Sequence, residues 1–483
     1  MNFARDVVDA APPDRRALVE IGRGGGRTEW SFGEVADRSA RLAATFATRH
    51  GVRRGDVVMT LIGNRPEWVI AMVACFRIGA VALPCNEQLR AKDLRQRLGV
   101  AHPKLILADE RNAPELTQAG PDCTVLTIPD ESLFNTANGS EPAPEFLPTD
   151  PCLITFTSGT TGEPKGIVHG QRYLPGQQLQ SQHWLDARPG DLVWCTATTG
   201  WSKSARNAFI APWIRGAAAL LHDERFDPAQ RIELINKHGV NVLCMAPTEY
   251  RVIAKRTTIP PLPSLRSLVA AGEALNPEVI RTFEEATKLQ IRDGYGQTET
   301  GQLTAMPPDV PVRPGSMGKP LPGVDLQVAD GELVLNDPRT DPTFFVRYLD
   351  DDAPAPEDRP WRTGDRVQVD EDGYLHFEGR TDDVIISAGY RIGPFEVESA
   401  LVSHEAVAEA AVVAAPDDER GAVVRAVIVV RDGFTPSDEL AAALQDHVRH
   451  QTAPYKYPRI VEFVTELPKT ASGKIRRAQL RDQ

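Results

Sequence analysis

A run rich in glycine and hydroxyl side chains follows a short apolar segment near residue 157, and this order constrains the local fold. Residues 153–156 suit a buried strand, and directly after them comes Thr157-Ser158-Gly159-Thr160-Thr161-Gly162-Glu163-Pro164-Lys165-Gly166. Backbone N–H groups of such a loop can turn toward anionic oxygens, hydroxyls add donors, and Lys165 supplies positive charge. The run is not a Walker A loop, because Pro164 stands where that motif needs its second glycine and Gly166 follows Lys165. The sequence therefore predicts a strand followed by a phosphate-binding loop of another type.

Between about residues 150 and 300, short β-rich runs alternate with helical patterns. A helix is expected over residues 228–238, stopped by Gly239 and followed by a buried strand over 240–246. Another is expected from Asn276, as the N-cap with Pro277 next to it, to about Leu289. This alternation is typical of an α/β fold with a parallel sheet, whose ligands bind at the carboxyl ends of the strands.

After Gly301 the sequence becomes rich in proline and glycine and contains short runs of alternating apolar and polar residues. This pattern predicts β-structure joined by turns. The major domain boundary is expected at residues 380–383. A small α+β unit follows, with helices over 395–403 and 437–450 and strands near 410–414 and 423–430.

Composition excludes several classes of protein. The 483 residues are 41% hydrophobic and 25% charged, as in an ordinary soluble protein, and the net charge of −12 argues against nucleic acid as the main partner. The six cysteines lack CxxC spacing and are expected to be reduced core residues. The N-terminus has no basic stretch leading into an apolar segment, and the apolar run 68–76 is too short to span a bilayer, so we expect a cytoplasmic protein without stable membrane insertion.

Further motifs follow the glycine-rich loop in one order. They are Ala271-Gly272-Glu273-Ala274-Leu275, Tyr295-Gly296-Gln297-Thr298-Glu299-Thr300, Trp361-Arg362-Thr363-Gly364-Asp365, Gly379-Arg380-Thr381-Asp382-Asp383 and Pro468-Lys469-Thr470-Ala471-Ser472-Gly473-Lys474. Together with the loop they resemble the adenylate-forming (ANL) superfamily of acyl-CoA synthetases, peptide-synthetase adenylation domains and luciferases. Residues 387–394 and 452–459 look most like the medium-chain acyl-CoA synthetases.

The resemblance implies a domain organisation and an activity. A large N-terminal domain of α/β subdomains with a β-barrel-like subdomain would occupy residues 1–380, residues 381–383 would form a hinge, and a small mobile α+β domain would occupy 384–483. With ATP, Mg²⁺ and a small carboxylic acid, such an enzyme makes an acyl-adenylate and releases pyrophosphate. It then transfers the acyl group to coenzyme A, leaving AMP.

The resemblance also implies roles for the motif residues in the first half-reaction. Glu299 would coordinate Mg²⁺, a hard cation that prefers carboxylate and phosphate oxygens, and Thr298 would hydrogen-bond the α-phosphate. Asp365, an acceptor-only carboxylate, would bind the ribose hydroxyls with help from Arg380. The other expected ATP- or AMP-binding residues are Thr157, Ser158, Gly159, Thr160, Thr161, Gly162 and Lys165 at the phosphates, and Gly272, Glu273, Ala274, Asp293, Gly294, Tyr295, Gly296 and Gln297 around the nucleotide.

The small domain would serve both half-reactions by rotating about Asp382. Lys474 would place an ammonium between the carboxylate and the α-phosphate during adenylation, and Arg391 would approach the phosphate in that conformation. Rotation would exchange Lys474 for the CoA-binding loop Ala388-Gly389-Tyr390, where glycine leaves room for the pantetheine arm. Acetylation of Lys474, added by an acetyltransferase and removed by a deacetylase, would abolish its charge.

The acyl pocket bears on which carboxylic acid is activated. Acetyl-specific relatives close the acyl pocket with tryptophan at the position of Gly296, so glycine implies a longer pocket, with Trp201 and Gly272 as walls. No basic residue marks a second carboxylate, and a medium-chain, branched or aryl acid would fit. The sequence leaves open a homodimer and two alternative functions: acyl transfer to a carrier protein, or an inactive relative of the fold.

Overall fold

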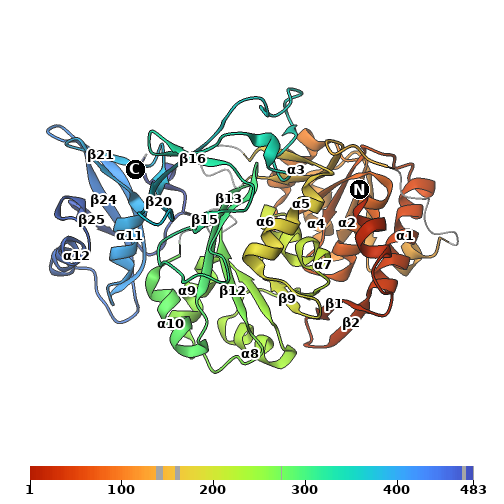
Figure 1. The fold of residues 1–483 in the computed structure, drawn as a ribbon, viewed down its shortest axis with the longest axis horizontal. Helices are drawn as coiled ribbons and strands as arrows, with labels where there is room; N and C mark the ends of the chain where they lie inside the picture. The colour runs from red at the N-terminus through yellow and green to blue at the C-terminus, as the bar shows by residue number, and fades with distance from the viewer. Residues whose placement is uncertain (137–144, 158–163, 274, 470–474, 482–483) are drawn as a thin grey trace.

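The computed structural model describes residues 1–136, 145–157, 164–273, 275–469 and 475–481 (Figure 1). Its first large sheet has seven strands in the order β18-β8-β7-β4-β3-β5-β6. The five strands from β7 to β6 run parallel, and β8 and β18 are antiparallel additions at one edge. The strands are β3 Val57–Leu61, β4 Val81–Cys85, β5 Leu105–Asp109, β6 Thr124–Ile128, β7 Pro151–Phe156, β8 Gly166–Gly170 and β18 Arg347–Tyr348.

The second large sheet has nine strands in the order β15-β14-β13-β12-β11-β9-β10-β1-β2. The six strands from β13 to β1 are parallel, as the alternating pattern predicts, and β2, β14 and β15 are antiparallel. They are β1 Arg16–Ile21, β2 Arg27–Ser31, β9 Leu192–Cys195, β10 Ala218–His222, β11 Val242–Met245, β12 Ser267–Ala271, β13 Ile291–Gln297, β14 Gly301–Ala305 and β15 Lys319–Pro320.

Helices flank both sheets. The α-helices of this part are α1 Phe32–Arg49, α2 Pro66–Ile78, α3 Ala91–Ala101, α4 Ala113–Ala119, α5 Tyr173–Gln180, α6 Ser202–Ala205, α7 Ala211–Ile214, α8 Pro228–His238, α9 Pro247–Arg256 and α10 Pro277–Thr287. Shorter or π-helical turns are η1 Ala4–Asp9, η2 Glu110–Asn112, η3 Glu131–Phe134, η4 Ser181–Leu185, η5 Arg206–Ile210 and η6 Pro338–Thr340. The apolar run 68–76 is fully buried within α2, and no described helix is both long and apolar enough to span a bilayer.

Local sequence signals explain where two of these helices begin and end. α8 follows the prediction, because the Asp227 side chain accepts from the backbone N–H of Gln230 and Gly239 ends the helix with φ 67°. α10 starts where Asn276 predicted it, but this side chain does not cap the helix. Instead Asn276 accepts from Arg251 Nε (3.2 Å) and donates to Ser399 Oγ (3.3 Å), so it connects three helices.

The β-rich region after Gly301 contains a four-stranded antiparallel sheet in the order β16-β17-β19-β20. Its strands are β16 Leu326–Ala329, β17 Glu332–Leu335, β19 Trp361–Val369 and β20 Leu375–Arg380. The β20 edge is extended by hydrogen bonds from the N–H of Met317 to Leu375 and from the N–H of Leu375 to Gly318. This is the part expected to be barrel-like.

The C-terminal part is a small α+β unit beside β13 and β20 (Figure 1). A hairpin of β21 Ile385–Ser387 and β22 Tyr390–Ile392 precedes a three-stranded sheet of β23 Val407–Asp417, β24 Gly421–Val430 and β25 Ile460–Phe463. Its helices are α11 Pro394–Val402, α12 Asp438–Gln451, η7 Pro454–Lys456 and α13 Arg477–Arg481. The expected helices and strands are present, each within a few residues of its predicted ends.

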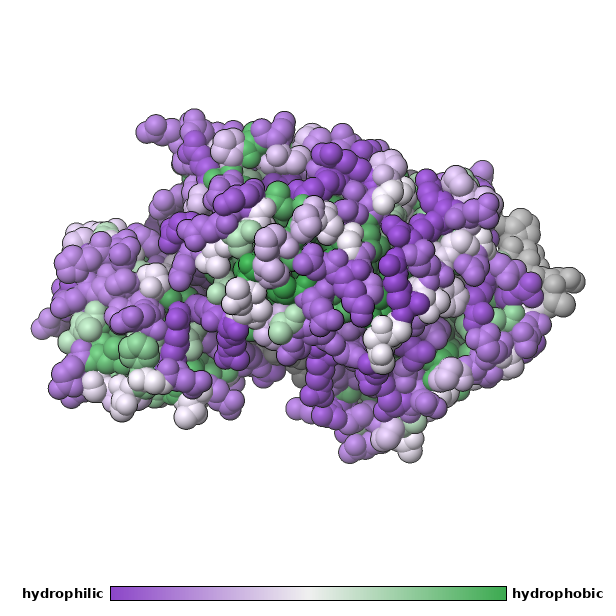
Figure 2. All heavy atoms as spheres, turned by 90° about the horizontal axis from the view of Figure 1, so that it is seen from below, coloured by the Kyte–Doolittle hydropathy of each residue, from purple (hydrophilic) through white to green (hydrophobic). Residues whose placement is uncertain are grey.

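Among the described residues, three extensive apolar cores and a smaller one in the four-stranded sheet stabilise the large part. A core built on α11, α12, β23 and β24, with a smaller cluster on the other face of that sheet, stabilises the small part. Five of the six cysteines are buried, as expected for reduced core residues, and Cys123 is half-buried. On the face seen in Figure 2, hydrophilic side chains cover most of the surface and hydrophobic ones gather only in small areas.

Candidate active site

The two ends of the glycine-rich loop are hydrogen-bonded to each other. β7 ends at Phe156; the N–H of Thr157 donates to the Lys165 carbonyl (2.9 Å), and the N–H of Lys165 donates to Thr157 Oγ1 (3.0 Å). Lys165 is exposed, and its ammonium lies 5.3 Å from the centre of the Tyr348 ring. Ser158, Gly159, Thr160, Thr161 and Gly162 lie outside the described residues.

Glu299 lies at the hydroxyl of the same tyrosine. The Tyr348 hydroxyl donates to Glu299 Oε1 (3.4 Å), and the Glu299 carbonyl accepts from the N–H of Phe345 (2.8 Å). Burial raises the pKa of the half-buried Glu299 carboxyl above its ordinary value. A lysine ammonium and a carboxylate thus both lie close to one tyrosine, at the junction of β8, β18 and the turn after β13. Thr298 precedes Glu299 in this turn and is half-buried.

Asp365 is the centre of a hydrogen-bonded cluster. Its Oδ2 accepts from the Tyr295 hydroxyl and from Gln297 Nε2 (2.9 Å), and its Oδ1 accepts from Arg380 (3.2 Å). The side chains come from three strands, β13, β19 and β20, so residues far apart in the sequence converge here. Gln297 also donates to the Thr363 carbonyl (2.7 Å), which fixes the orientation of its amide.

Burial dominates the electrostatics of this cluster. Asp365 is 4% exposed, and burial raises its pKa, while the Arg380 guanidinium opposes this effect. The pKa of Tyr295 is raised by burial and by the adjacent carboxylate. Tyr295 therefore remains a neutral hydrogen-bond donor, and Arg380 keeps its charge at the exposed edge of the cluster.

The carboxyl ends of β12 and β13 position the other nucleotide residues. Gly272 follows β12 with φ 99° and is exposed, and Glu273 Oε2 accepts from Thr248 Oγ1 (2.7 Å) on α9. Asp293 is buried and accepts from the N–H of Gly294 (2.8 Å), and burial raises its pKa to about 8. A Cβ on Gly294 would lie 2.9 Å from the Thr304 carbonyl oxygen and 2.2 Å from Gln302 Nε2, so a side chain there would force its neighbours to shift. Ala274 lies outside the described residues.

The structure changes the interpretation of Gly296 and places a basic group beside Gly272. A Cβ on Gly296 would lie 1.7 Å from the Gly301 carbonyl oxygen, so the space beside Gly296 is filled by backbone and is not an open pocket. In addition, a basic group lies beside one expected wall, Gly272: Lys203 Nζ donates to the Ala271 carbonyl (3.0 Å). Trp201 is half-buried immediately before α6.

The described C-terminal candidates, Arg391 and residues 388–390, make no contact with the Asp365 cluster. Arg391 is exposed and makes no side-chain hydrogen bond or ion pair with any described residue. In the β21–β22 turn, Ala388 and Gly389 have φ 48° and 84°, and Tyr390 stacks on Tyr455 with ring centres 4.3 Å apart. Figure 1 shows β21 on the far side of β20 from β13.

The segment expected to act as a hinge adjoins the cluster. Asp382 is exposed and lies 3.7 Å from Arg380 Nε, and its carbonyl accepts from Arg481 (2.7 Å). Lys474 lies outside the described residues.

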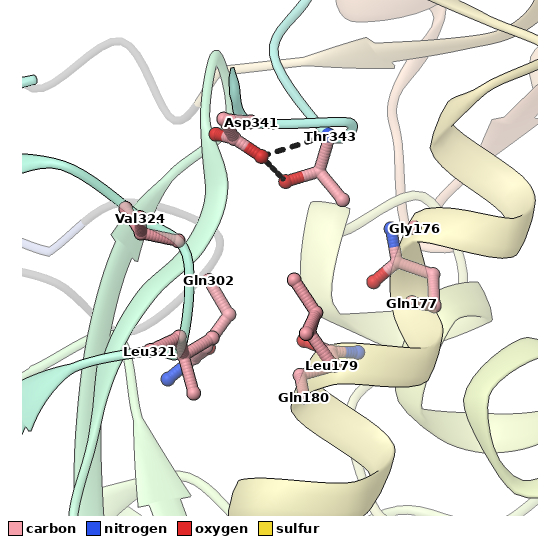
Figure 3. Close-up of a pocket in the computed structure, with 9 residues that line it drawn as sticks. All are labelled: Gly176, Gln177, Leu179, Gln180, Gln302, Leu321, Val324, Asp341 and Thr343. Atoms are coloured by element: carbon pink, nitrogen blue, oxygen red, sulfur yellow. Dashed lines mark hydrogen bonds between the residues drawn. The ribbon is translucent and has the colours of Figure 1, made fainter. Parts of the chain in front are cut away.

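A separate small pocket lies between α5 and β14 (Figure 3). Three glutamines line it, and each uses its amide nitrogen: Gln177 donates to Tyr173, Gln180 to Asn207 and Gln302 to Thr304. Their Oε1 atoms, with Oδ2 of Asp341, have no hydrogen-bond partner among the described residues.

Sequence reasoning did not assign roles to Tyr348 and Trp361. Trp361 donates to Gln297 Oε1 (3.2 Å), and its place in a recognised motif was the only signal for it. Tyr348 had no signal, because its position depends on the pairing of β18 with β8, more than 170 residues earlier.

Comparisons with known proteins agree with this arrangement. The models of the AMP-binding enzyme family and of the AMP-binding enzyme C-terminal domain match residues 5–338 and 396–474. Acyl-coenzyme A synthetase ACSM4 of Rattus norvegicus is 39% identical, over 100% of this chain and 90% of its own length.

Two solved structures share the fold over nearly their whole length. The anthranilate CoA ligase AuaEII in complex with anthranoyl-AMP is 28% identical with a TM-score of 0.89, covering 99% of this chain and 96% of that one. A benzoate CoA ligase from Burkholderia xenovorans LB400 is 27% identical with a TM-score of 0.88, covering 100% of both. The chain therefore belongs to the AMP-binding enzymes of the adenylate-forming superfamily and, within it, to the acyl-CoA ligases.

Proposed function

We propose that the protein couples ATP to the activation of a carboxylic acid and then forms its CoA thioester. In the first step an acid oxygen attacks the α-phosphorus and pyrophosphate leaves; in the second the CoA thiol attacks the acyl carbon and AMP leaves. The observation that carries the proposal is the cluster of Tyr295, Gln297 and Arg380 around Asp365, which suits a nucleoside. Positioning and charge stabilisation would supply most of the catalysis.

We assign roles to the described residues on chemical grounds. Asp365 would accept hydrogen bonds from the two ribose hydroxyls, while Arg380 keeps that carboxylate ionised. Lys165 lies where a polyphosphate could extend past Tyr348, and Glu299 fits Mg²⁺, which is held by one or two carboxylates together with phosphate oxygens. The Mg²⁺ would supply charge neutralisation at the leaving pyrophosphate.

We propose that the two half-reactions use the small domain differently. In this scheme residues 1–380 and 384–483 form the two domains, 381–383 is the hinge, and Lys474 and Arg391 act in adenylation. The turn Ala388–Tyr390 would reach the site only after rotation, which is supported by its exposed position away from Asp365. A homodimer, acetylation of Lys474 and a cytoplasmic location stay predictions.

The test is pyrophosphate release with ATP and Mg²⁺ across acetate, butyrate, hexanoate, octanoate, decanoate and benzoate, with and without CoA, following acyl-CoA by mass. We expect CoA-dependent turnover with a medium-chain, branched or aryl acid. Adenylate formation that CoA never accelerates would favour transfer to a carrier protein. No pyrophosphate with any acid would contradict the proposal and favour the inactive alternative.

A further inference from the structure

The chain just before Asp382, the expected hinge, is held by the large part. The N–H of Thr381 donates to the Gly364 carbonyl on β19 (2.8 Å). Arg380, at the end of β20, donates to Asp365 Oδ1 (3.2 Å). These contacts fix the backbone up to Thr381 against the four-stranded sheet, so a rotation of the small part has to begin at Asp382.

Arg481 holds the chain immediately after the hinge. Its Nη1 donates to the Asp382 carbonyl (2.7 Å) and lies 3.0 Å from Asp383 Oδ1. A carbonyl oxygen lies beyond both soft backbone torsions of its own residue, so it moves with the segment that follows. Both partners of Arg481 are therefore on the small-domain side of a rotation at Asp382, and the rotation leaves both contacts intact.

Arg481 is itself anchored in the small part. It ends α13, in which Leu480 is buried in the apolar cluster on β23 and β24. The Leu480 carbonyl accepts from Arg425 on β24 (3.1 Å). At the other end of α13, Arg477 donates to both carboxylate oxygens of Glu398 on α11 (2.7 and 2.8 Å). One helix thus ties the segment after the hinge to the body of the small part.

The same helix follows the residue expected to act in adenylation. Lys474 lies outside the described residues, and α13 begins three positions after it, at Arg477. Between them, Ile475 forms an antiparallel bridge with Lys469. α13 therefore connects the expected hinge to the part of the chain that carries the expected catalytic lysine.

We propose that Arg481 is a positioning residue that makes the end of the hinge and α13 move as one body. The N–H groups of Asp383 and Val384 donate to the Arg380 carbonyl (3.0 and 3.1 Å), so these bonds span the hinge and a rotation breaks them. The contacts of Arg481 do not span it. They confine the rotation to Asp382 and pass it to the small domain in both directions. This inference rests on the proposed function and adds to it a residue that touches no substrate.

Separate assays of the two half-reactions test the inference. Adenylation is followed as exchange of labelled pyrophosphate into ATP with the acid that the wild type turns over best. Thioester formation is followed from the adenylate of that acid and CoA. For Arg481→Met we expect kcat of both half-reactions to fall about 10- to 100-fold, as for loss of a hydrogen bond between charged groups. KM for ATP should stay at the wild-type value, because the expected ATP site lies in the large part.

Matched variants separate positioning from a general loss of stability. Arg481→Lys should retain part of both rates, because an ammonium can still donate to one of the two partners. Gln479→Ala, at an exposed position on the same helix, should leave both rates unchanged. Asp383→Asn removes the carboxylate that pairs with Arg481, so its effect on kcat and that of Arg481→Met should be less than additive in the double variant.

Unchanged rates in Arg481→Met, a raised KM for ATP, full additivity with Asp383→Asn, or slowing of one half-reaction alone would each overturn the inference. In all these cases turnover by the wild type leaves the proposed function standing. No adenylate from the wild type with any acid would overturn both.

Discussion

The Tyr295 hydroxyl donates a hydrogen bond to the Asp365 carboxylate, although 70 positions separate the two residues. The contact joins the carboxyl end of β13 to β19, and Gln297 and Arg380 complete it. The motif that contains Tyr295, expected beside the base, and the motif that contains Asp365, expected at the ribose, thus form one hydrogen-bonded unit. This unit is preorganised, because each of its polar groups already has a partner in the protein.

Removing the charge of Asp365 should weaken nucleotide binding more than removing the Tyr295 hydroxyl. Asp365→Asn keeps the shape but replaces one acceptor oxygen by a donor that faces Tyr295 or Arg380. We expect KM for ATP to rise about 10- to 100-fold, the effect of losing hydrogen bonds to a charged acceptor. Steady-state kinetics with ATP varied checks this, with Tyr295→Phe as the milder comparison. An unchanged KM for ATP in Asp365→Asn would contradict the ribose assignment.

Neutralising Glu299 should affect chemistry more than folding. Glu299→Gln retains the size and the contact with Tyr348, yet loses the charge that would hold Mg²⁺. We expect kcat for pyrophosphate release to fall about 10²- to 10³-fold, as for loss of one electrostatic contact in a transition state, and the Mg²⁺ concentration for half-maximal rate to rise. A Mg²⁺ titration of wild type and variant measures both. Equal Mg²⁺ dependence would remove Glu299 from the metal site.

Adding one methyl group at Gly296 should damage the fold and not select chain length. The new Cβ would meet the Gly301 carbonyl at 1.7 Å, and overpacking of this kind costs about 1–3 kcal/mol or more. We expect Gly296→Ala to lower Tm and to reduce turnover of all acids alike. Gly99→Ala in α3 is the control, since nothing lies within 4 Å of its Cβ position. A shifted chain-length profile at wild-type Tm would restore the open-pocket interpretation.

Asp341 should make stability depend on pH. Burial raises its pKa to about 7, and the hydrogen bonds from Thr343 to its Oδ1 oppose this only in part. The folded state therefore holds this proton more tightly than the unfolded state, whose carboxyl pKa is about 4, so stability is lost as pH rises from about 4 to about 7.

Asp341→Asn removes this titration, while its amide oxygen can still accept from Thr343. We expect the difference in Tm, variant minus wild type, to be larger at pH 8 than at pH 5. The wild type loses a free energy of unfolding on the order of a few kcal/mol as Asp341 ionises, and the variant does not. Scanning calorimetry at both pH values measures it, with the exposed Asp418→Asn as control. A difference in Tm that is the same at both pH values would contradict the assignment.

The residues that sequence predicted well are those whose roles depend on local pattern. Gly239 and Pro277 mark helix ends through backbone preferences of their own, and α8 and α10 end and begin there. Asp365 and Tyr295, which are hydrogen-bonded to each other, could be singled out because each belongs to a recognisable motif.

What sequence did not predict depends on contacts between distant segments. The Lys203 ammonium is held by a hydrogen bond to the Ala271 carbonyl, 68 positions away. The space beside Gly296 is occupied by the backbone of Gly301, where β14 begins. The ammonium beside Gly272 therefore emerged only once α6 was placed against β12.

Isotope transfer tests the central claim, acyl-adenylate formation, most directly. The acid is labelled with ¹⁸O in its reacting carboxyl group, and AMP, pyrophosphate and phosphate are analysed by mass spectrometry after turnover with ATP and CoA. Attack of the acid oxygen on the α-phosphorus predicts one ¹⁸O atom in AMP for each acyl-CoA formed, and none in pyrophosphate. Unlabelled AMP, or label recovered in phosphate, would contradict the account.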